Sequence, residues 1–200
     1  MLNVALTGNV AAGKSTVARL FQKWGATLID SDVIVRQLQQ PGNDVLSRIV
    51  RAFGPDILQD DGTLDRAALR HRVMNDTTAR QSLNTIVHPA VLARRQELEA
   101  EARARGDTIL VSDIPLLFEA ADPAAFDVIV LVDAAPATRK ARLVEDRGLE
   151  PLEADRLLAA QDPTETKRER SDYVIDNDGT EAQLELATRA VWQALAARAV

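Results

Sequence analysis

The chain has 200 residues, of which 46% are hydrophobic and 27% charged, a composition typical of a single globular domain spanning residues 1–200. The net charge of −6 argues against non-specific nucleic-acid binding, which needs a basic face, and the absence of cysteine excludes disulfide frameworks, thiolate zinc sites and cysteine nucleophiles. No apolar run approaches the roughly 18 residues of a membrane span, and the N-terminus lacks a signal-peptide pattern, so we expect a cytoplasmic protein with no membrane or nucleic-acid partner.

Short apolar runs and a helical pattern alternate at the start of the chain. Residues 4–6 predict a buried strand that runs into a glycine, and residues 27–29 predict a second strand. Between them, residues 16–24 carry apolar side chains at helical spacing, and Gly25 ends that helix.

The stretch from residue 32 to about 105 is predicted to be helical almost throughout. One apolar stripe ends at Gly54. A second is expected to end at His88-Pro89, because proline lacks the amide that helix continuation needs. A long charged helix follows, up to Gly106. Because this stretch is too long for one crossover helix, we expect an inserted substrate-binding subdomain at about residues 32–105.

The second half of the chain returns to strands separated by helices. Residues 108–111 and 128–132 are continuous apolar runs, as expected of strands buried on both faces of a parallel sheet. The pattern as a whole predicts an α/β fold with a mainly parallel, five-stranded sheet flanked by helices. The remaining predicted elements are helices at residues 136–147 and 151–161, a short strand at 173–175 and a C-terminal helix.

Residues 8–15 match the phosphate-binding pattern G-x-x-x-x-G-K-[ST] in full, between a predicted strand and a predicted helix. In such a P-loop, glycines allow a close approach, and successive amides point at a triphosphate near the positive end of the helix. Lys14 supplies charge to the β and γ phosphates, and the Ser15 hydroxyl is placed to ligate Mg²⁺. We therefore expect ATP and Mg²⁺ as cofactors, with the nucleotide bound by Gly8, Asn9, Val10, Ala11, Ala12, Gly13, Lys14, Ser15 and Thr16.

The P-loop alone does not choose among GTPases, ATPases and small-molecule kinases. The sequence contains no Asn-Lys-x-Asp segment, which is typical of guanine-specific proteins. Asp113 follows an apolar run and is a candidate Mg²⁺ ligand, although Ser112 interrupts that run. The small size and the basic helix after the fourth strand favour a kinase with a lid at about residues 138–170.

Several further segments occur in one characteristic order over nearly the whole chain, and together they resemble the dephospho-CoA kinase family. No segment beyond the P-loop is decisive by itself, but their joint occurrence is specific. They are Ile29-Asp30-Ser31-Asp32, Asp61-Gly62-Thr63-Leu64-Asp65-Arg66, His88-Pro89, Asp113-Ile114-Pro115-Leu116-Leu117-Phe118-Glu119, Arg142-Leu143 with Arg147, Gln161 with Lys167, and Val174-Ile175-Asp176-Asn177-Asp178-Gly179.

The resemblance implies transfer of the γ-phosphoryl group of ATP to the ribose 3′-hydroxyl of dephospho-CoA. It makes Lys14 and Asp32 catalytic, with the Asp32 carboxylate as general base or hydroxyl-orienting group. The structural alternative is that Asp32 caps the following helix, a role that Asp30 also fits. Arg142 and Arg147 are expected to stabilise charge on the transferred group, although a solvated basic face would show the same pattern.

The resemblance assigns further contacts, each with a structural alternative. Arg66 is expected to meet a substrate phosphate, or to be a surface arginine after a turn. His88 is expected at a structural joint that lines the acceptor pocket. Leu116 and Glu119 belong to a block placed against the substrate near Mg²⁺, where core packing is the better reading for the leucine. Asn177 is expected to contact adenine, or to be an ordinary turn residue.

The sequence departs from the family pattern at Ser171, where alanine is usual, and at Asn9 and Ala11, where the family often has glycine. Asparagine accepts left-handed backbone angles better than most residues, so Ala11 is the harder case. Two alternatives stay open: a different small-molecule kinase, acting on a nucleoside monophosphate, shikimate or gluconate, and a non-catalytic ATP-binding switch. The oligomeric state is also open.

Overall fold

The computed structural model describes residues 1–74, 76–115, 117–161 and 163–199, and it divides into two compact units. Unit 1 consists of Met1–Ile29 and Ala102–Val200, and unit 2 consists of Asp30–Glu101. Each unit is built around its own apolar cluster. Unit 2 overlaps the stretch for which an inserted subdomain is expected.

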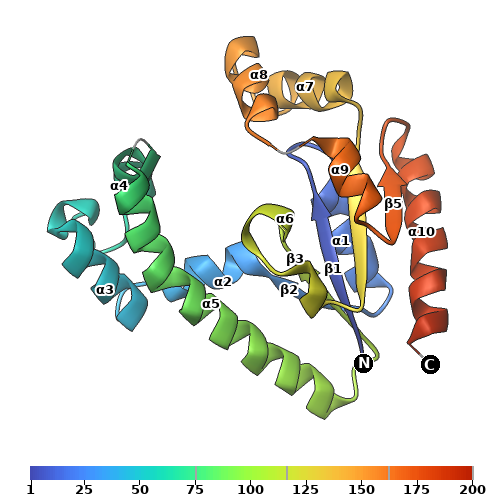
Figure 1. Cartoon of the computed structure of the whole chain (residues 1–200), viewed down its shortest axis with the longest axis horizontal. Coiled ribbons are helices and arrows are strands. Elements are labelled where there is room, and N and C mark those ends of the chain that lie inside the picture. Colours follow the sequence, from blue (N-terminus) through green and yellow to red (C-terminus); the bar gives the residue numbers. More distant parts are fainter. Residues whose placement is uncertain (75, 116, 162, 200) are drawn as a thin grey trace. The chain divides into compact units, whose positions relative to one another are not determined.

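A five-stranded sheet forms the centre of unit 1, which confirms the predicted α/β class (Figure 1). The strands lie in the order β2-β3-β1-β4-β5, and β1 pairs in parallel with both β3 and β4. Their parallel registers bring Leu6 opposite Asp113 and Gly8 opposite Val132. The loops that follow β1, β3 and β4 therefore leave the same edge of the sheet, where ligands bind in open α/β folds. The strands are β1 (Leu2–Gly8), β2 (Thr27–Asp30), β3 (Ile109–Asp113), β4 (Val128–Asp133) and β5 (Tyr173–Asp176).

Alternate strand residues pack on opposite faces of this sheet. Val4 and Leu6 belong to a cluster with Phe21 of α1 (Lys14–Lys23) and Leu195 of α10 (Glu181–Arg198). Ala5 belongs to a smaller cluster with residues that follow β3. Both faces are thus covered, which explains why β3 and β4 are apolar without alternation.

The rest of unit 1 consists of short helices that follow β3 and β4. The predicted helices after β4 are present, but the charge-rich segment before β5 also folds into a helix, which the sequence analysis did not predict. These elements are α6 (Leu117–Ala120), η2 (Pro123–Ala125), α7 (Pro136–Glu145), α8 (Pro151–Ala159) and α9 (Thr164–Glu169).

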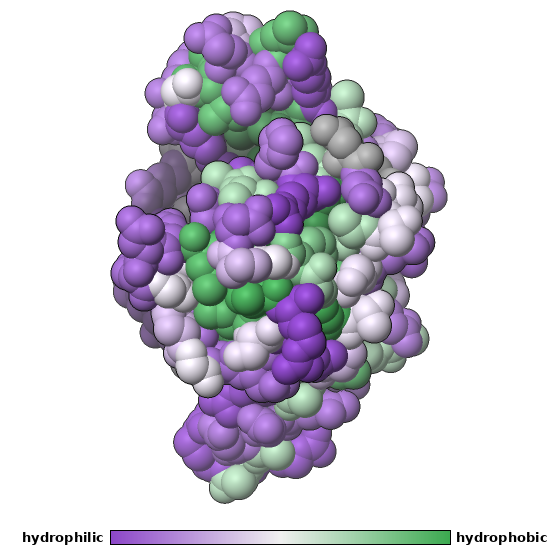
Figure 2. All heavy atoms as spheres, turned by 90° about the vertical axis from the view of Figure 1, so that its left-hand side faces the viewer, coloured by the Kyte–Doolittle hydropathy of each residue, from purple (hydrophilic) through white to green (hydrophobic). Residues whose placement is uncertain are grey.

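Unit 2 is a helical body with a separate core. It contains α2 (Ser31–Leu38), α3 (Asp44–Phe53), η1 (Pro55–Ile57), α4 (Arg66–Met74) and most of α5 (Thr77–Arg105). The apolar stripe of α3 packs against α4 and α5, with Val45, Leu46, Ile49, Leu69, Ile86 and Val87 among the buried residues. Figure 2 shows a surface of mostly hydrophilic side chains, between which hydrophobic ones gather in more than one area.

The predicted helix end at His88-Pro89 is wrong, because Pro89 lies inside the 29-residue helix α5. Proline removes one intrahelical hydrogen bond, to the carbonyl four residues earlier. That carbonyl belongs to Thr85, and both Thr85 and Pro89 are exposed, so solvent is available to it. The flanking Ile86 and Val87 are buried in the unit 2 core, and this packing holds the helix across the proline.

Within the described part of the chain, no helix is long and apolar enough to cross a membrane.

Candidate active site

The P-loop joins β1 to α1 and needs glycine at two positions. A Cβ atom on Gly8 would lie 2.6 Å from the Val132 carbonyl oxygen of the neighbouring strand. Gly13 has a φ of 95°, and a Cβ there would overlap the Asn177 side-chain amide. The first and last glycines of the motif are therefore required by backbone approach and by backbone conformation.

The loop position most unlike the family pattern, Ala11, has a φ of 60°. It is the only non-glycine residue with positive φ in the part of the chain that the structure describes. Holding an alanine there costs roughly 1–2 kcal/mol, because the Cβ approaches the following carbonyl oxygen. Asn9 does not need such a conformation, and its side chain makes contacts of its own.

The start of α1 is available to an anion. Its N-cap, Gly13, makes no side-chain capping hydrogen bond, so the first amides of the helix have no side-chain partner there. Lys14 forms an ion pair with Asp113, and both side chains are largely buried, at 14% and 9% exposure. Ser15 follows on the first turn and is exposed. A lysine paired with a carboxylate, and a hydroxyl next to that lysine in sequence, thus lie at the start of the helix, where a P-loop binds a triphosphate.

Ser15 and Asp113 form a donor set that fits Mg²⁺. This ion prefers oxygen ligands and usually takes one or two protein groups, with water and phosphate oxygens completing six. Among the residues that the structure describes, no group of three or more His, Cys, Asp or Glu side chains is arranged to hold a metal ion. The described residues therefore do not offer a metal site made of protein ligands alone. A single carboxylate beside the P-loop suits an ion that is bound together with the nucleotide.

Arg142 and Asn177 both contact the P-loop backbone. The Arg142 guanidinium donates to the Ala11 carbonyl at 3.1 Å and to the Asn177 carbonyl at 2.8 Å. The Asn177 side-chain amide donates to the Ala12 carbonyl at 2.8 Å. Asn177 is 7% exposed, so it is a buried support of the loop and more than an ordinary turn residue.

Arg147 is placed differently from Arg142. It follows the end of α7, is exposed, and has no hydrogen bond or ion pair to any described residue. The neighbouring helices α7 and α8 are joined by an ion pair between Lys140 and Asp155, at 2.7 Å. Of the two arginines expected to stabilise the transferred group, Arg142 is held at the P-loop, whereas Arg147 has no such contact.

A set of contacts from α9 to the P-loop was missed by sequence reasoning. Lys167 is 2% exposed, and its ammonium group donates to Asn9 at 2.8 Å and to Glu119 at 2.6 Å. Glu119, expected to meet substrate, is therefore paired with a buried lysine. The only sequence signal was the joint presence of Gln161 and Lys167 in the family pattern, which says nothing about their partners.

A second cation of α9 contacts acidic residues at the carboxyl ends of β4 and β5. Arg168 forms ion pairs with Asp133 at 2.8 Å and Asp176 at 2.6 Å. Hydrogen bonds to Asp176, which has the larger effect, and to Asp133 raise the pKa of the Arg168 guanidinium above its usual value. Close by, the Thr138 hydroxyl and the Ala135 amide lower the pKa of Asp178.

In unit 2, the structure separates the roles of two neighbouring aspartates. Asp30 is the N-cap of α2, and its carboxylate accepts from the amides of Asp32 at 2.8 Å and Val33 at 3.1 Å. Asp32 lies in the first helical turn with an exposed side chain. The capping alternative thus applies to Asp30, and the carboxylate of Asp32 remains available for other chemistry.

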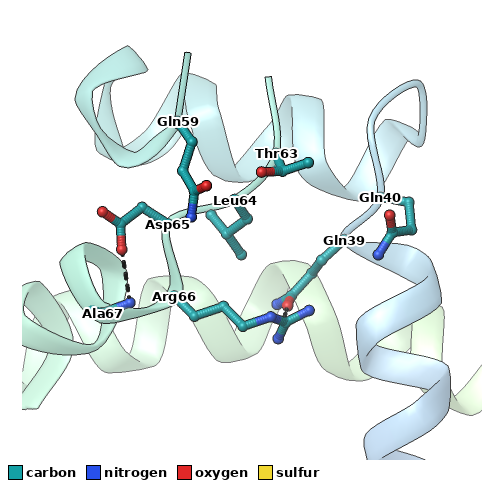
Figure 3. Close-up of a pocket in the computed structure, with 8 residues that line it drawn as sticks. All are labelled: Gln39, Gln40, Gln59, Thr63, Leu64, Asp65, Arg66 and Ala67. Atoms are coloured by element: carbon teal, nitrogen blue, oxygen red, sulfur yellow. Dashed lines mark hydrogen bonds between the residues drawn. The ribbon is translucent and has the colours of Figure 1, made fainter. Parts of the chain in front are cut away.

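Arg66 lines a pocket of about 430 Å³ within unit 2 (Figure 3). Its guanidinium donates to the buried Gln39 at 2.8 Å, and Asp65 beside it caps α4 through the amides of residues 67 and 68. The other lining side chains are mainly amides and hydroxyls, from Gln40, Gln59 and Thr63. His88 is an exposed residue of α5, and Leu116 lies outside the described residues.

Comparison with known proteins agrees with this arrangement. The dephospho-CoA kinase family model matches residues 2–183. A dephospho-CoA kinase of Streptomyces avermitilis is 44% identical over 199 residues, which cover 100% of this chain and 96% of that protein. One of Mycolicibacterium paratuberculosis is 44% identical over 192 residues, and there the match covers 96% of this chain but about half, 47%, of the relative.

A crystal structure from Thermus thermophilus superposes with a TM-score of 0.80 at 33% identity and covers 97% of both chains. The match thus extends through the sheet, the P-loop and the helical unit together. The chain belongs to the dephospho-CoA kinase family.

Proposed function

We propose that the protein transfers the γ-phosphoryl group of ATP to the ribose 3′-hydroxyl of dephospho-CoA, which yields coenzyme A and ADP. The observation that carries the proposal is the P-loop with Lys14 paired to Asp113, in a chain that matches the dephospho-CoA kinase family over residues 2–183. We further propose a cytoplasmic enzyme with small-molecule substrates and no nucleic-acid or membrane partner.

The nucleotide is bound by the P-loop amides and the start of α1. Lys14 leaves Asp113 and reaches the β and γ phosphates, where it neutralises charge that moves toward the leaving ADP. Ser15 and Asp113 would hold Mg²⁺, and the ion would supply positive charge that offsets the charge of the phosphates. Arg142 and Asn177 keep the loop in the shape that presents its amides.

Asp32 acts on the acceptor. Its carboxylate accepts the hydrogen bond of the 3′-hydroxyl and takes the proton as the oxygen attacks the γ-phosphorus and the bond to the bridging oxygen breaks. The exposed position of Asp32 in the first turn of α2, with the capping role filled by Asp30, supports this assignment.

Other residues position the acceptor and the transferred group. The Arg66 pocket offers one guanidinium and several amides, which suit a phosphate and the amide-rich arm of the substrate. His88 is proposed to line the acceptor pocket, and Leu116 and Glu119 are proposed to contact the substrate. The lid at about residues 138–170 carries Arg147, whose unpaired guanidinium stabilises charge in the transition state.

An acceptor panel tests the proposal. Purified protein with Mg-ATP is offered dephospho-CoA, AMP, adenosine, shikimate or gluconate, and ADP release and product mass are measured. We expect turnover with dephospho-CoA alone and a product heavier by one phosphate group. Turnover with another acceptor would reject the substrate assignment, and ATP binding without any stimulated turnover would favour the switch alternative.

Two matched variants test the mechanism. Asp32→Asn should lower kcat by roughly 10²–10⁴-fold with ATP affinity unchanged, because only proton transfer is lost. Asp30→Asn is the control, since asparagine caps a helix as well as aspartate does. Equal activity of the two variants would show that Asp32 has no part in the chemistry.

A further inference from the structure

Lys167 is a buried charge that the proposed chemistry does not use. It lies on α9 and is 2% exposed, yet it carries an ammonium group. A buried charge is tolerated only when it is paired and hydrogen-bonded. Its partners are the Asn9 carbonyl oxygen at 2.8 Å and a Glu119 carboxylate oxygen at 2.6 Å, and they come from two different parts of the candidate site.

The first partner, Asn9, lies in the P-loop, and its side chain forms hydrogen bonds with two residues of α9. While the Asn9 carbonyl oxygen accepts from Lys167, its amide nitrogen donates to the Thr164 hydroxyl at 2.8 Å. The next backbone amide, of Val10, donates to the Gln161 side chain at 2.9 Å. Three hydrogen bonds thus connect the first half of the P-loop to α9 and to Gln161, three residues before the helix.

The second partner belongs to the segment after β3. Glu119 lies on α6, and the neighbouring Phe118 ring stacks under the Arg170 guanidinium at 4.5 Å from its centroid. This segment begins at Asp113, the residue that pairs with Lys14. α9 therefore contacts both the loop that contains Lys14 and the segment that contains its acidic partner.

We propose that Lys167 is a positioning residue that holds the first half of the P-loop and the β3–α6 segment in fixed relation through Asn9 and Glu119. Its ammonium group is occupied by protein atoms, so it acts through these two residues and does not need to touch nucleotide. Without it, the P-loop amides and Asp113 would shift independently, and small displacements of such groups weaken binding strongly. The inference rests on the proposed use of ATP, but not on which acceptor is used.

Lys167→Met tests the proposal, with affinity for a fluorescent ATP analogue measured without acceptor, so that a wrong acceptor assignment would not affect the result. We expect the dissociation constant to rise by about tenfold or more. Arg168→Gln is the matched control, because it removes the adjacent cation of α9, whose partners Asp133 and Asp176 lie outside the P-loop. It should lower the melting temperature but leave nucleotide affinity within about twofold at a temperature where both variants are folded.

Asn9→Ala keeps the Lys167–Glu119 pair and removes both links of the Asn9 side chain to α9, to Lys167 and to Thr164, so it decides the question if Lys167→Met does not fold. It should also weaken nucleotide binding several-fold, and in the Asn9→Ala/Lys167→Met double variant the two losses should not multiply, because both changes break the Lys167–Asn9 link. Wild-type affinity in folded Lys167→Met or in Asn9→Ala would overturn the proposal. Multiplying effects in the double variant, or an equal loss in Arg168→Gln, would also overturn it.

Discussion

Mutation of the two arginines after β4, Arg142 and Arg147, should affect different properties of the protein. Arg142 donates two hydrogen bonds from a charged group, to the carbonyl of Ala11 in the P-loop and to the carbonyl of Asn177 in the loop after β5. Such bonds contribute roughly 1.5–3 kcal/mol each, and because Arg142 is only partly buried, the two together contribute about 2 kcal/mol. For a chain of this size, that loss lowers the melting temperature by about 4–8 °C. Arg147 has no comparable contact and is exposed.

Arg142→Met should therefore lower both the melting temperature and the ATP affinity. Arg147→Met should leave the melting temperature within roughly 2 °C of wild type, as expected for an exposed side chain, and should lower kcat without changing ATP affinity. Thermal melts and ATP titrations of both variants, followed by steady-state kinetics, measure these effects. A wild-type melting temperature and ATP affinity in Arg142→Met would refute the structural role inferred for its two hydrogen bonds.

Four further predictions concern local features. Ala11→Gly relieves the positive φ and should raise stability by about 0.5–1 kcal/mol after the entropy of glycine is subtracted, visible as a slightly higher melting temperature. Asp30→Ala removes the α2 cap and should cost about 1 kcal/mol in urea unfolding, and no change would contradict the capping role. Pro89→Ala restores one hydrogen bond in α5 and should stabilise the protein by about 1–3 kcal/mol, whereas destabilisation would mean that the proline is required there. Because folding lowers the pKa of Asp178, its carboxylate stabilises the protein at pH values above its unfolded-state pKa, and this contribution is lost as the pH falls through its folded-state pKa. The melting temperature of Asp178→Ala should therefore lie below that of wild type at pH 7, and the difference should close below about pH 4. A difference in melting temperature that does not depend on pH would contradict this prediction.

Features that depend on neighbouring residues could be predicted from the sequence. The P-loop is contiguous, so its glycines, Lys14 and Ser15 are recognisable together, and the apolar runs of β3 and β4 report burial on both faces. The five-stranded sheet was predicted correctly for this reason. Asp32 was also singled out, but only the capping geometry separates it from Asp30, because either residue type suits either position.

The contacts that complete the nucleotide side of the site come from tertiary structure alone. Lys167 meets Asn9 across 158 positions, Arg142 meets Ala11 across 131, and Asn177 meets Ala12 across 165. A lysine in a charge-rich segment looks solvated, since nothing in its local sequence records a buried partner. Pro89 shows the same limit, because the packing of Ile86 and Val87 in unit 2 outweighs a local preference for ending the helix. Local sequence determined which elements form and where phosphate binds, whereas long-range packing decided which polar side chains support that site, because burial and pairing depend on residues far away in the chain.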